Sequence, residues 1–287
     1  MSARRRGFTL VELMIALILM SVVGTVLYRL VSSTQRVATA QAERMLLQSN
    51  VRTGALVVPA ELREIATNAA GQTDLVQIAA DSVTYRAARG IGFTCAVTST
   101  QVKIRNSAVL PYSGLRGVSA GRDSLLLFVE SDPTTAADDR WVRLAVSSVA
   151  TSTCGSDPAI AVTTPNFLAL LPGGLLSTVV VGGPVRVEEV MRLKGYASGA
   201  DRWVGAQSVS AGESVQPILG PIAANGFRLA YFDSVGATTT VPASVRTIQV
   251  TLIGVTERAV ARGGNSGPNA LIQDTLVTRV MLRNAPR

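Results

Sequence analysis

The sequence predicts an α+β protein in which one long N-terminal helix carries a β-rich head. An apolar run from Phe8 to Tyr28 is followed by apolar residues at helical spacing to about residue 68. From about residue 69 to 287 the apolar residues alternate, and turn residues become frequent. The head could divide further into two sub-sheets, at about 69–164 and 165–287.

The apolar run is long enough to cross a bilayer once. From Phe8 to Tyr28 a helix rises by about 30 Å, which matches the thickness of the hydrocarbon layer. The cluster Arg4, Arg5 and Arg6 precedes this run and acts as a topology signal, because basic residues stay on the cytoplasmic side. We therefore expect a single-pass protein whose N-terminus is cytoplasmic and whose head is exported.

Glu12 distinguishes this segment from two simpler alternatives, a cleaved secretory signal peptide and a plain signal anchor. A carboxylate in a membrane helix costs about 2.5–3.5 kcal/mol on insertion scales, so it should persist only with a partner. A secretory signal also has a shorter apolar region and a small-residue cleavage site close behind it, which is not evident here. In a plain anchor, Glu12 would have no role.

The helical pattern continues beyond the membrane as an amphipathic stem that we expect to be half buried. Gly54 and Pro59 predict a weak point or kink, with a last helical piece starting at Pro59. The apolar positions that define the amphipathic face are Leu27, Val31, Ala38, Ala42 and Met45.

Short strands separated by turns predict the head. The stretch from Ser124 to Glu130 is apolar on both faces, which is typical of a central strand. Gly182–Pro184 and Gly195–Asp201 predict breaks between strands, and Ala261–Asn269 predicts an exposed loop. Further strands are expected at 141–146, 177–181, 185–193, 202–206, 226–232, 245–252 and 275–282, with a loop or short helix at 165–177.

The composition argues against an enzyme. The chain has no histidine, which excludes Ser-His-Asp and Cys-His catalysis and histidine-ligated metals. It also has no phosphate-binding loop, dinucleotide fingerprint or nucleophile elbow, so we expect no cofactor and no metal. Loss of the three leading arginines would leave 24 basic against 19 acidic residues, lowering the net charge from +8 to +5.

The two cysteines, Cys95 and Cys154, are disulfide candidates if the head is exported. Closing a loop of about 60 residues would stabilise the fold by roughly 4 kcal/mol in the chain-entropy model. The alternative is a pair of unbonded, buried thiols.

The run from Gly7 to Leu13, GFTLVEL, follows the basic leader and opens the apolar helix. It resembles the class III signal of type IV pilins and type II secretion pseudopilins. The resemblance implies that a prepilin peptidase cleaves between Gly7 and Phe8, and that the new Phe8 terminus is N-methylated. Residues 1–7 would then be a leader peptide, 8–68 the transmembrane and stem helix, and 69–287 a pilin-like head.

The same resemblance associates Glu12 with the N-terminal amine of a neighbouring subunit. Cleavage creates an α-ammonium at Phe8, and a neighbouring helix shifted by about one turn could place its carboxylate beside that group. Two costly buried charges would satisfy one another and fix the axial register of otherwise uniform apolar helices.

Several strands of the head are similar to those of PilW-type minor pilins and J-type pseudopilins, namely 184–187, Trp203, 227–232, 246–252 and 280–284. This likeness implies a minor pilin of a type IV pilus that primes or caps the filament, with other minor pilins and the major pilin as partners. The head would lie in the periplasm of a bacterium with its anchor in the inner membrane, and later in the fibre at the cell surface. The J-type pseudopilin of a type II secretion system is the alternative.

Two further groups could give the head a ligand. Asp132, Asp138 and Asp139 could hold Ca²⁺, but without the spacing of a calcium loop we favour a solvated turn. A pilus-tip adhesin or a DNA-uptake receptor is a second alternative function. Nucleic acid is the less favoured ligand, because the pairs of tryptophan and arginine fit ordinary strand packing equally well: Trp141 with Arg140 and Arg143, and Trp203 with Arg202.

Overall fold

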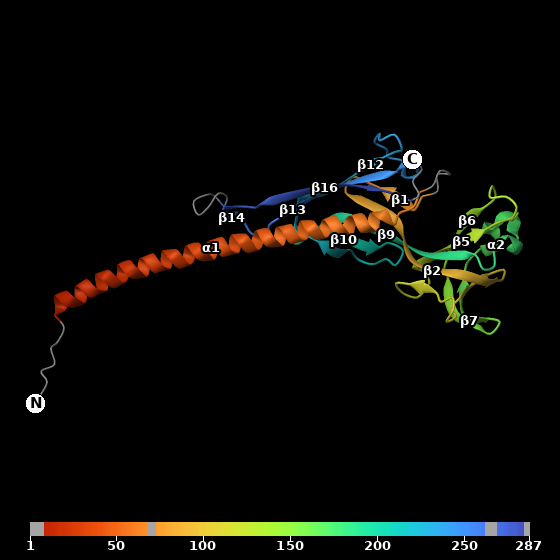
Figure 1. The fold of residues 1–287 in the computed structure, drawn as a ribbon, viewed down its shortest axis with the longest axis horizontal. Coiled ribbons are helices and arrows are strands. Elements are labelled where there is room, and N and C mark those ends of the chain that lie inside the picture. Colours follow the sequence, from red (N-terminus) through yellow and green to blue (C-terminus); the bar gives the residue numbers. More distant parts are fainter. Residues whose placement is uncertain (1–8, 68–72, 262–268, 284–287) are drawn as a thin grey trace, which may run out of the picture.

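A long helix, α1 (Leu10–Arg63), extends from the head and ends inside it. The computed structural model describes residues 9–67, 73–261 and 269–283 (Figure 1). The helix has 54 residues, a length of about 80 Å. Its N-terminal half stands alone, and its C-terminal half lies along the sheets of the head. The predicted α+β class, a long N-terminal helix followed by a β-rich head, is confirmed.

The stem is a single helix, because α1 continues through both Gly54 and Pro59 without a break and no separate helical piece begins at Pro59. Both residues are buried against the head. Packing of this kind overrides the weak local preference of a single glycine or proline, which acts by only about 1–3 kcal/mol.

The side of the stem that meets the head is also different from the predicted one. The expected apolar face is exposed, with Val31 at 52% and Met45 at 69% of full exposure. A different stripe is buried, and its members recur every three or four residues: Glu43, Leu47, Val51, Gly54, Val58 and Leu62. The helix carries apolar residues on several sides, so periodicity alone could not decide which side the head covers.

Two polar contacts tie this buried stripe to the head. Glu43 accepts the backbone N–H of Arg258 at 3.3 Å, and Asn50 accepts that of Gly220 at 3.1 Å. Arg258 lies in the loop after strand β13 (Thr247–Val255) of one sheet, and Gly220 directly follows strand β11 (Gln216–Leu219) of the other, so the stem is fixed to both layers of the head.

One large antiparallel sheet contains eleven strands, in the order β11-β10-β9-β2-β3-β8-β7, with β5 attached at β9, β6 attached at β5, and β1 and β4 attached at β2. These strands are β1 (Leu75–Ile78), β2 (Ser82–Val97), β3 (Gln101–Arg105), β4 (Ser113–Gly114), β5 (Asp123–Val129), β6 (Arg140–Ala145), β7 (Ser148–Cys154), β8 (Asp157–Thr163), β9 (Pro184–Ser198), β10 (Asp201–Ser208) and β11 (Gln216–Leu219).

The second sheet has the order β12-β13-β16 and lies on the other side of the stem, and a short hairpin of β14 and β15 runs beside the helix (Figure 1). Its strands are β12 (Ile222–Phe232), β13 (Thr247–Val255) and β16 (Gln273–Met281), and the hairpin is β14 (Val260–Ala261) and β15 (Asn269–Ala270). The short helices are α2 (Phe167–Leu170), η1 (Pro172–Gly174), η2 (Leu176–Thr178) and η3 (Pro242–Ser244).

The division of the head into sub-sheets at about 164/165 does not match this topology. Strand β9 lies after that boundary, yet it pairs with β2 from Ser82 opposite Lys194 to Phe93 opposite Pro184. Pairing between distant segments leaves no signal in local alternation. The break predicted within Gly195–Asp201 is confirmed, since β9 ends at Ser198 and β10 begins at Asp201. The central strand expected at Ser124–Glu130 is confirmed as β5, between β6 and β9.

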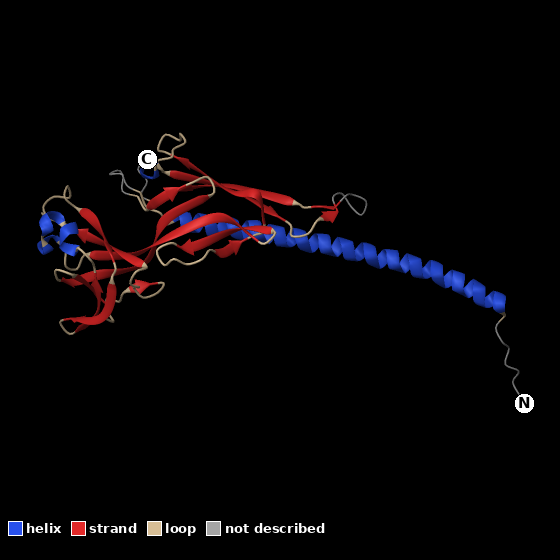
Figure 2. Cartoon of the chain, turned by 180° about the vertical axis from the view of Figure 1, so that it is seen from behind, coloured by secondary structure: helices blue, strands red, loops and turns tan. Residues whose placement is uncertain are grey.

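The head has two hydrophobic cores, and β9 contributes to both. The stem core lies between α1, the three-stranded sheet and the adjoining parts of β2, β9 and β10. The distal core lies among β3, β5, β8, β9 and α2, at the end away from the membrane helix (Figure 2). Along β9, Val185 and Val187 belong to the distal core and Leu193 belongs to the stem core.

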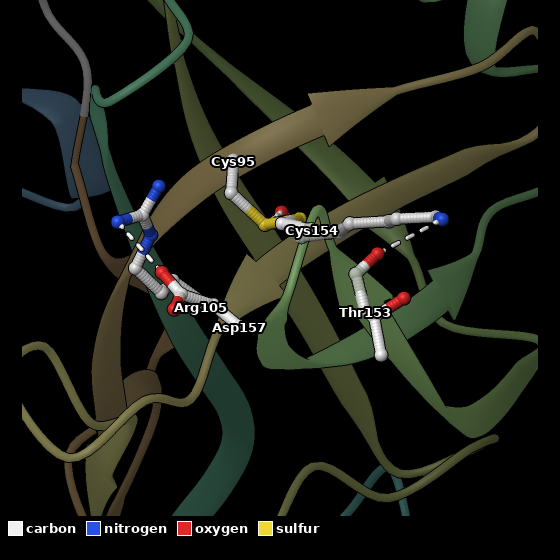
Figure 3. The surroundings of a disulfide bond; sticks show 6 residues. Cys95, Arg105, Thr153, Cys154 and Asp157 are labelled. Atoms are coloured by element: carbon white, nitrogen blue, oxygen red, sulfur yellow. Dashed lines mark hydrogen bonds and ion pairs between the residues drawn. A yellow bond between two sulfur atoms is a disulfide. The ribbon is translucent and has the colours of Figure 1, made fainter.

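A disulfide bond joins Cys95 of β2 to Cys154 at the end of β7, the pair that the sequence offers (Figure 3). The bond crosses the distal sheet, in which β3 and β8 separate these two strands. An ion pair between Arg105 and Asp157 lies beside it, at 3.1 Å. The disulfide therefore connects strands that are not hydrogen-bonded to each other.

Gly54 is the point of closest approach between the stem and the head, and we expect Gly54→Leu to destabilise the head. A Cβ atom there would overlap Leu252 Cδ2 and lie 3.1 Å from Leu219 Cδ2. Overpacking of this kind costs roughly 1–3 kcal/mol.

Thermal unfolding of the detergent-solubilised protein measures this effect. Gly24→Leu is the matched control, since it makes the same chemical change on the same helix with no atom within 4 Å of the new Cβ. Equal melting temperatures for the two variants would contradict the close packing of α1 against β13.

Candidate assembly site

The start of α1 is closed by a capping box formed by Thr9 and Glu12. The Glu12 backbone N–H donates to Thr9 Oγ1 at 3.3 Å, and the Thr9 backbone N–H donates to Glu12 Oε2 at 3.4 Å. Such a box satisfies two backbone donors that a helix start leaves free, and the carboxylate also interacts favourably with the helix dipole. Glu12 thus has a partner within its own chain. Arg4, Arg5, Arg6, Gly7 and Phe8 lie outside the described residues.

The helix that follows exposes apolar side chains on all sides. Its N-terminal portion has no buried residue in the described structure, and α1 is the one described helix that is long and apolar enough to cross a membrane. Burying this surface in lipid would be strongly favourable, because transfer of apolar area from water releases roughly 25 cal/mol per Å². The large exposed side chains between Leu10 and Tyr28 include Met14, Leu17, Ile18, Met20 and Val23.

Buried charges occupy the part of β9 that lies between the two cores. Glu189 is 1% exposed and is surrounded by three guanidinium groups. Its Oε2 accepts from Arg89 Nε at 2.8 Å and from Arg116 Nη2 at 3.1 Å, and its Oε1 accepts from Arg122 Nε at 2.5 Å. The Ser208 hydroxyl donates to the same carboxylate.

Asp123 extends this group on the neighbouring strand. It stands opposite Glu189 in the pairing of β5 with β9. The two carboxylates would repel each other, but Arg116 lies between them and donates to Asp123 at 2.7 and 2.6 Å through its two terminal nitrogens. One arginine therefore links two buried carboxylates on adjacent strands.

The preceding residue, Glu188, points to the other face of the sheet and is fully buried. It accepts from Arg143 Nε at 3.0 Å and lies 3.8 Å from Arg186. Asp74 shares these two arginines, at 3.6 and 3.9 Å. The two adjacent glutamates consequently have separate sets of cations.

The two glutamates differ in pKa because their hydrogen bonding differs. Burial alone would raise the pKa of Glu189, but hydrogen bonds from Ser208, Arg89, Arg122 and Arg116 outweigh it and lower the pKa to about 2. For Glu188, burial raises the pKa above its ordinary value, and nearby Arg143 opposes that rise only in part. Glu189 is therefore held as a carboxylate over a wide range of pH.

From the sequence alone, Glu188 and Glu189 would be assigned to an exposed strand or bulge position, and their burial shows that this prediction is wrong. A glutamate pair inside an apolar strand is usually read as solvent-facing, since unpaired carboxylates are rarely buried. The arginines that surround Glu189 stand at 89, 116 and 122, far from it in the sequence. Nothing in their spacing showed that they converge on β9.

Three of the five residues considered for DNA binding make contacts within the head, namely Trp141, Arg143 and Trp203. Trp141 packs edge-on against Phe128, with ring centroids 5.4 Å apart. Arg143 donates through Nε to buried Glu188 at 3.0 Å. Trp203 lies against Gly220, where a Cβ would clash with its ring. These contacts support the reading of both tryptophans as strand residues that pack within the head.

Asp132 and Asp138, two of the acidic residues considered for Ca²⁺, accept hydrogen bonds within their own loop. Asp138 Oδ2 accepts the backbone N–H groups of Ser131 at 2.9 Å and of Asp132 at 2.7 Å. Asp132 Oδ1 accepts from the Thr134 backbone and hydroxyl. Asp139 is exposed beside them. Within the described residues, no group of three or more metal-binding side chains is found.

Comparison with known proteins gives one match. Residues 2–28 fit the family model of the prokaryotic N-terminal methylation motif, a range that contains the basic cluster, Gly7, Phe8 and Glu12. No curated protein and no solved structure matches the chain. The match thus covers the N-terminal residues and the first part of α1, and the head is described by its own structure.

We expect Glu189→Gln to destabilise the head by about 3–5 kcal/mol, because it leaves three guanidinium groups around a neutral side chain. Glu188→Gln is the matched control. It makes the same change one residue away, at a carboxyl whose pKa burial raises and which accepts a hydrogen bond from one guanidinium group instead of three, and should cost less.

The pH dependence of unfolding provides a second readout. A carboxyl whose pKa is lowered on folding stabilises the protein above its unfolded pKa of about 4.3, and this contribution is lost as the pH falls toward 2. The unfolding free energy of the wild type should therefore fall more steeply between these pH values than that of Glu189→Gln. Parallel curves would show that Glu189 is not held ionised by its arginines.

Proposed function

We propose that this protein is a minor pilin of a type IV pilus, which enters the filament through its N-terminal helix and primes or caps filament assembly. The observation that carries the proposal is the methylation motif at residues 2–28, which supports a type IV pilin-like or pseudopilin protein. Together with the apolar helix, it supports anchoring in a membrane through one N-terminal segment. The role is structural and not catalytic.

The proposed processing follows from the motif. A prepilin peptidase cuts the bond between Gly7 and Phe8 on the cytoplasmic side, and the new amine of Phe8 is methylated. The arginines at 4, 5 and 6 hold the leader in the cytoplasm, so the head lies in the periplasm before it is moved to the fibre at the cell surface.

Glu12 then provides the assembly contact. In the isolated chain its carboxylate accepts from the Thr9 backbone at 3.4 Å, a long and therefore weak hydrogen bond. A neighbouring subunit's α-ammonium offers a charge-assisted partner, which is roughly twice as strong as a neutral one. In lipid, the gain from pairing two buried charges fixes how far one helix is shifted along the next.

The size of the head supports a place as a minor subunit of the filament and not as a subunit of its shaft. The distal core and its disulfide extend well beyond the end of α1 (Figure 1). Such bulk is tolerated where a subunit has neighbours on one side only, as at a tip. The partners would be other minor pilins and the major pilin.

A J-type pseudopilin of a type II secretion system is the second candidate, because the same methylation motif supports it equally. Both machines would use the leader, the helix and Glu12 in the same way. Deletion of the gene separates them: loss of surface pili indicates the first function, and loss of protein secretion with normal pili indicates the second.

The mass of the mature protein tests the processing. Protein extracted from membranes of the native host should lack residues 1–7 and carry one added methyl group on Phe8. Gly7→Val should keep the leader, because a bulky residue would block the peptidase. A mature chain that starts at Met1 would remove the basis of the proposed function.

Glu12→Ala should leave membrane insertion intact or improve it, since it removes a cost of about 2.5–3.5 kcal/mol, but should strongly reduce incorporation into filaments. Thr9→Val is the matched control, because it removes the hydroxyl of the capping box and keeps the carboxylate. Filaments sheared from cells and probed for this subunit provide the measurement. Equal incorporation of Glu12→Ala and wild type would show that the charge is dispensable.

A further inference from the structure

The stem has a second apolar stripe, opposite to the one that the head covers. Its residues alternate in spacing between four and three, which is the pattern of a coiled-coil seam. All of them are exposed, and they lie about 180° around the helix axis from the buried stripe. We call this stripe the outer seam; it consists of Val31, Gln35, Ala38, Ala42, Met45, Ser49, Arg52 and Leu56.

Five of the eight outer-seam residues are apolar, so this face of the stem can pack against another helix. Met45 is 69% and Leu56 is 68% exposed, and Ala38 and Ala42 are small enough to let another helix approach closely. It lies above the membrane segment on the same continuous helix. A partner that spans the same membrane with the same orientation would therefore run parallel to it.

The charge of the stem limits which partner fits. Between residues 13 and 60 the sequence has four arginines, at 29, 36, 44 and 52, and a single carboxylate, Glu43. Glu43 faces the head and is only 6% exposed. None of the four arginines forms an ion pair within the part of the chain that the structure describes. Arg52 is the one that lies in the outer seam.

A second copy of this chain does not satisfy Arg52. In register, Arg52 would face Arg52 of the copy. Displaced by one heptad, it would face Met45 or Pro59, of which Pro59 is buried under the copy's own head. A guanidinium enclosed in an apolar seam without a carboxylate is costly, and like charges across a seam disfavour that pairing.

Anionic lipid headgroups at the membrane surface do not pair with Arg52 either. Arg52 lies 24 residues beyond Tyr28, the end of the apolar run, which is about 36 Å along the helix. Anionic lipid headgroups attract basic residues only within about 10 Å at ordinary salt concentration. The partner that pairs with Arg52 is therefore a protein and not a lipid headgroup.

We propose that the outer seam binds, in parallel, the stem helix of a different pilin-like chain that places an aspartate or glutamate opposite Arg52. This inference rests on the proposed function and adds the chemistry of the partner. Arg52 favours a partner stem that carries a carboxylate and disfavours a second copy of this chain. The subunit is therefore incorporated next to another kind of subunit. A single polar residue in a coiled-coil seam selects partners in the same way.

Photo-crosslinking of the full-length chain in its native host tests the proposal. The probe is p-benzoylphenylalanine in place of Met45, and mass spectrometry identifies the crosslinked peptide. The expected product joins Met45's position to the N-terminal helix of another chain that has Asp or Glu about seven residues further along, opposite Arg52. A crosslink to this chain's own stem, to lipid, to a helix without that carboxylate, or to nothing overturns the proposal.

Two variants separate charge from packing. In a host that makes the peptidase but no other pilin, Arg52→Leu should raise self-crosslinking through the Met45 position by about tenfold, because it makes the seam apolar. Arg36→Leu removes the same charge from the head side of the stem and should change nothing. Equal effects of the two variants would show that total charge, and not the seam, excludes self-association.

Processing distinguishes a failure of this inference from a failure of the proposed function. The same samples give the mass of the mature chain. If residues 1–7 are removed and Phe8 is methylated but the crosslink is wrong, only the outer seam is rejected. If the chain is not processed, the proposed function is rejected.

Discussion

The structure depends on one helix that is at once a membrane segment and a core element of the head. The stripe from Leu47 to Leu62 is enclosed by both sheets, and Gly54 lets Leu252 approach the helix backbone. The head covers only this side of the C-terminal half of α1. The N-terminal half of the helix and the outer seam therefore remain accessible. The same helix can then be held by lipid, by its own head and by a neighbouring subunit without any of these contacts excluding another.

Strand β9 connects the stem core of the head to its distal core. It contributes side chains to both hydrophobic cores, and its buried glutamates lie where one core ends and the other begins. A buried charge network adds little net stability over an apolar replacement, yet removal of one member is severe because the others stay unpaired. The network therefore makes the junction intolerant of change, and Arg116 couples β9 to β5 through two carboxylates.

In the proposed assembly, Glu12 has different partners at successive stages. At the helix start it closes a capping box with Thr9, which accounts for a carboxylate in an apolar helix even before any assembly. The hydrogen bonds of this box are long, at 3.3 and 3.4 Å. Exchange of that contact for a neighbour's ammonium, as in the proposed assembly, would cost the chain little and would supply a stronger interaction.

The sequence by itself determined the elements whose signals are local. These are the basic cluster, the apolar span, the Glu12 motif and the β-rich head, because hydropathy and short motifs depend on neighbouring residues. Only the tertiary structure decided which stripe of the stem is covered, since Met45 and Leu47 are equally apolar and the head selects between them. It also decided that β9 pairs with β2 and that Glu188 and Glu189 are buried. These outcomes depend on residues about 100 positions apart, which no local pattern reports.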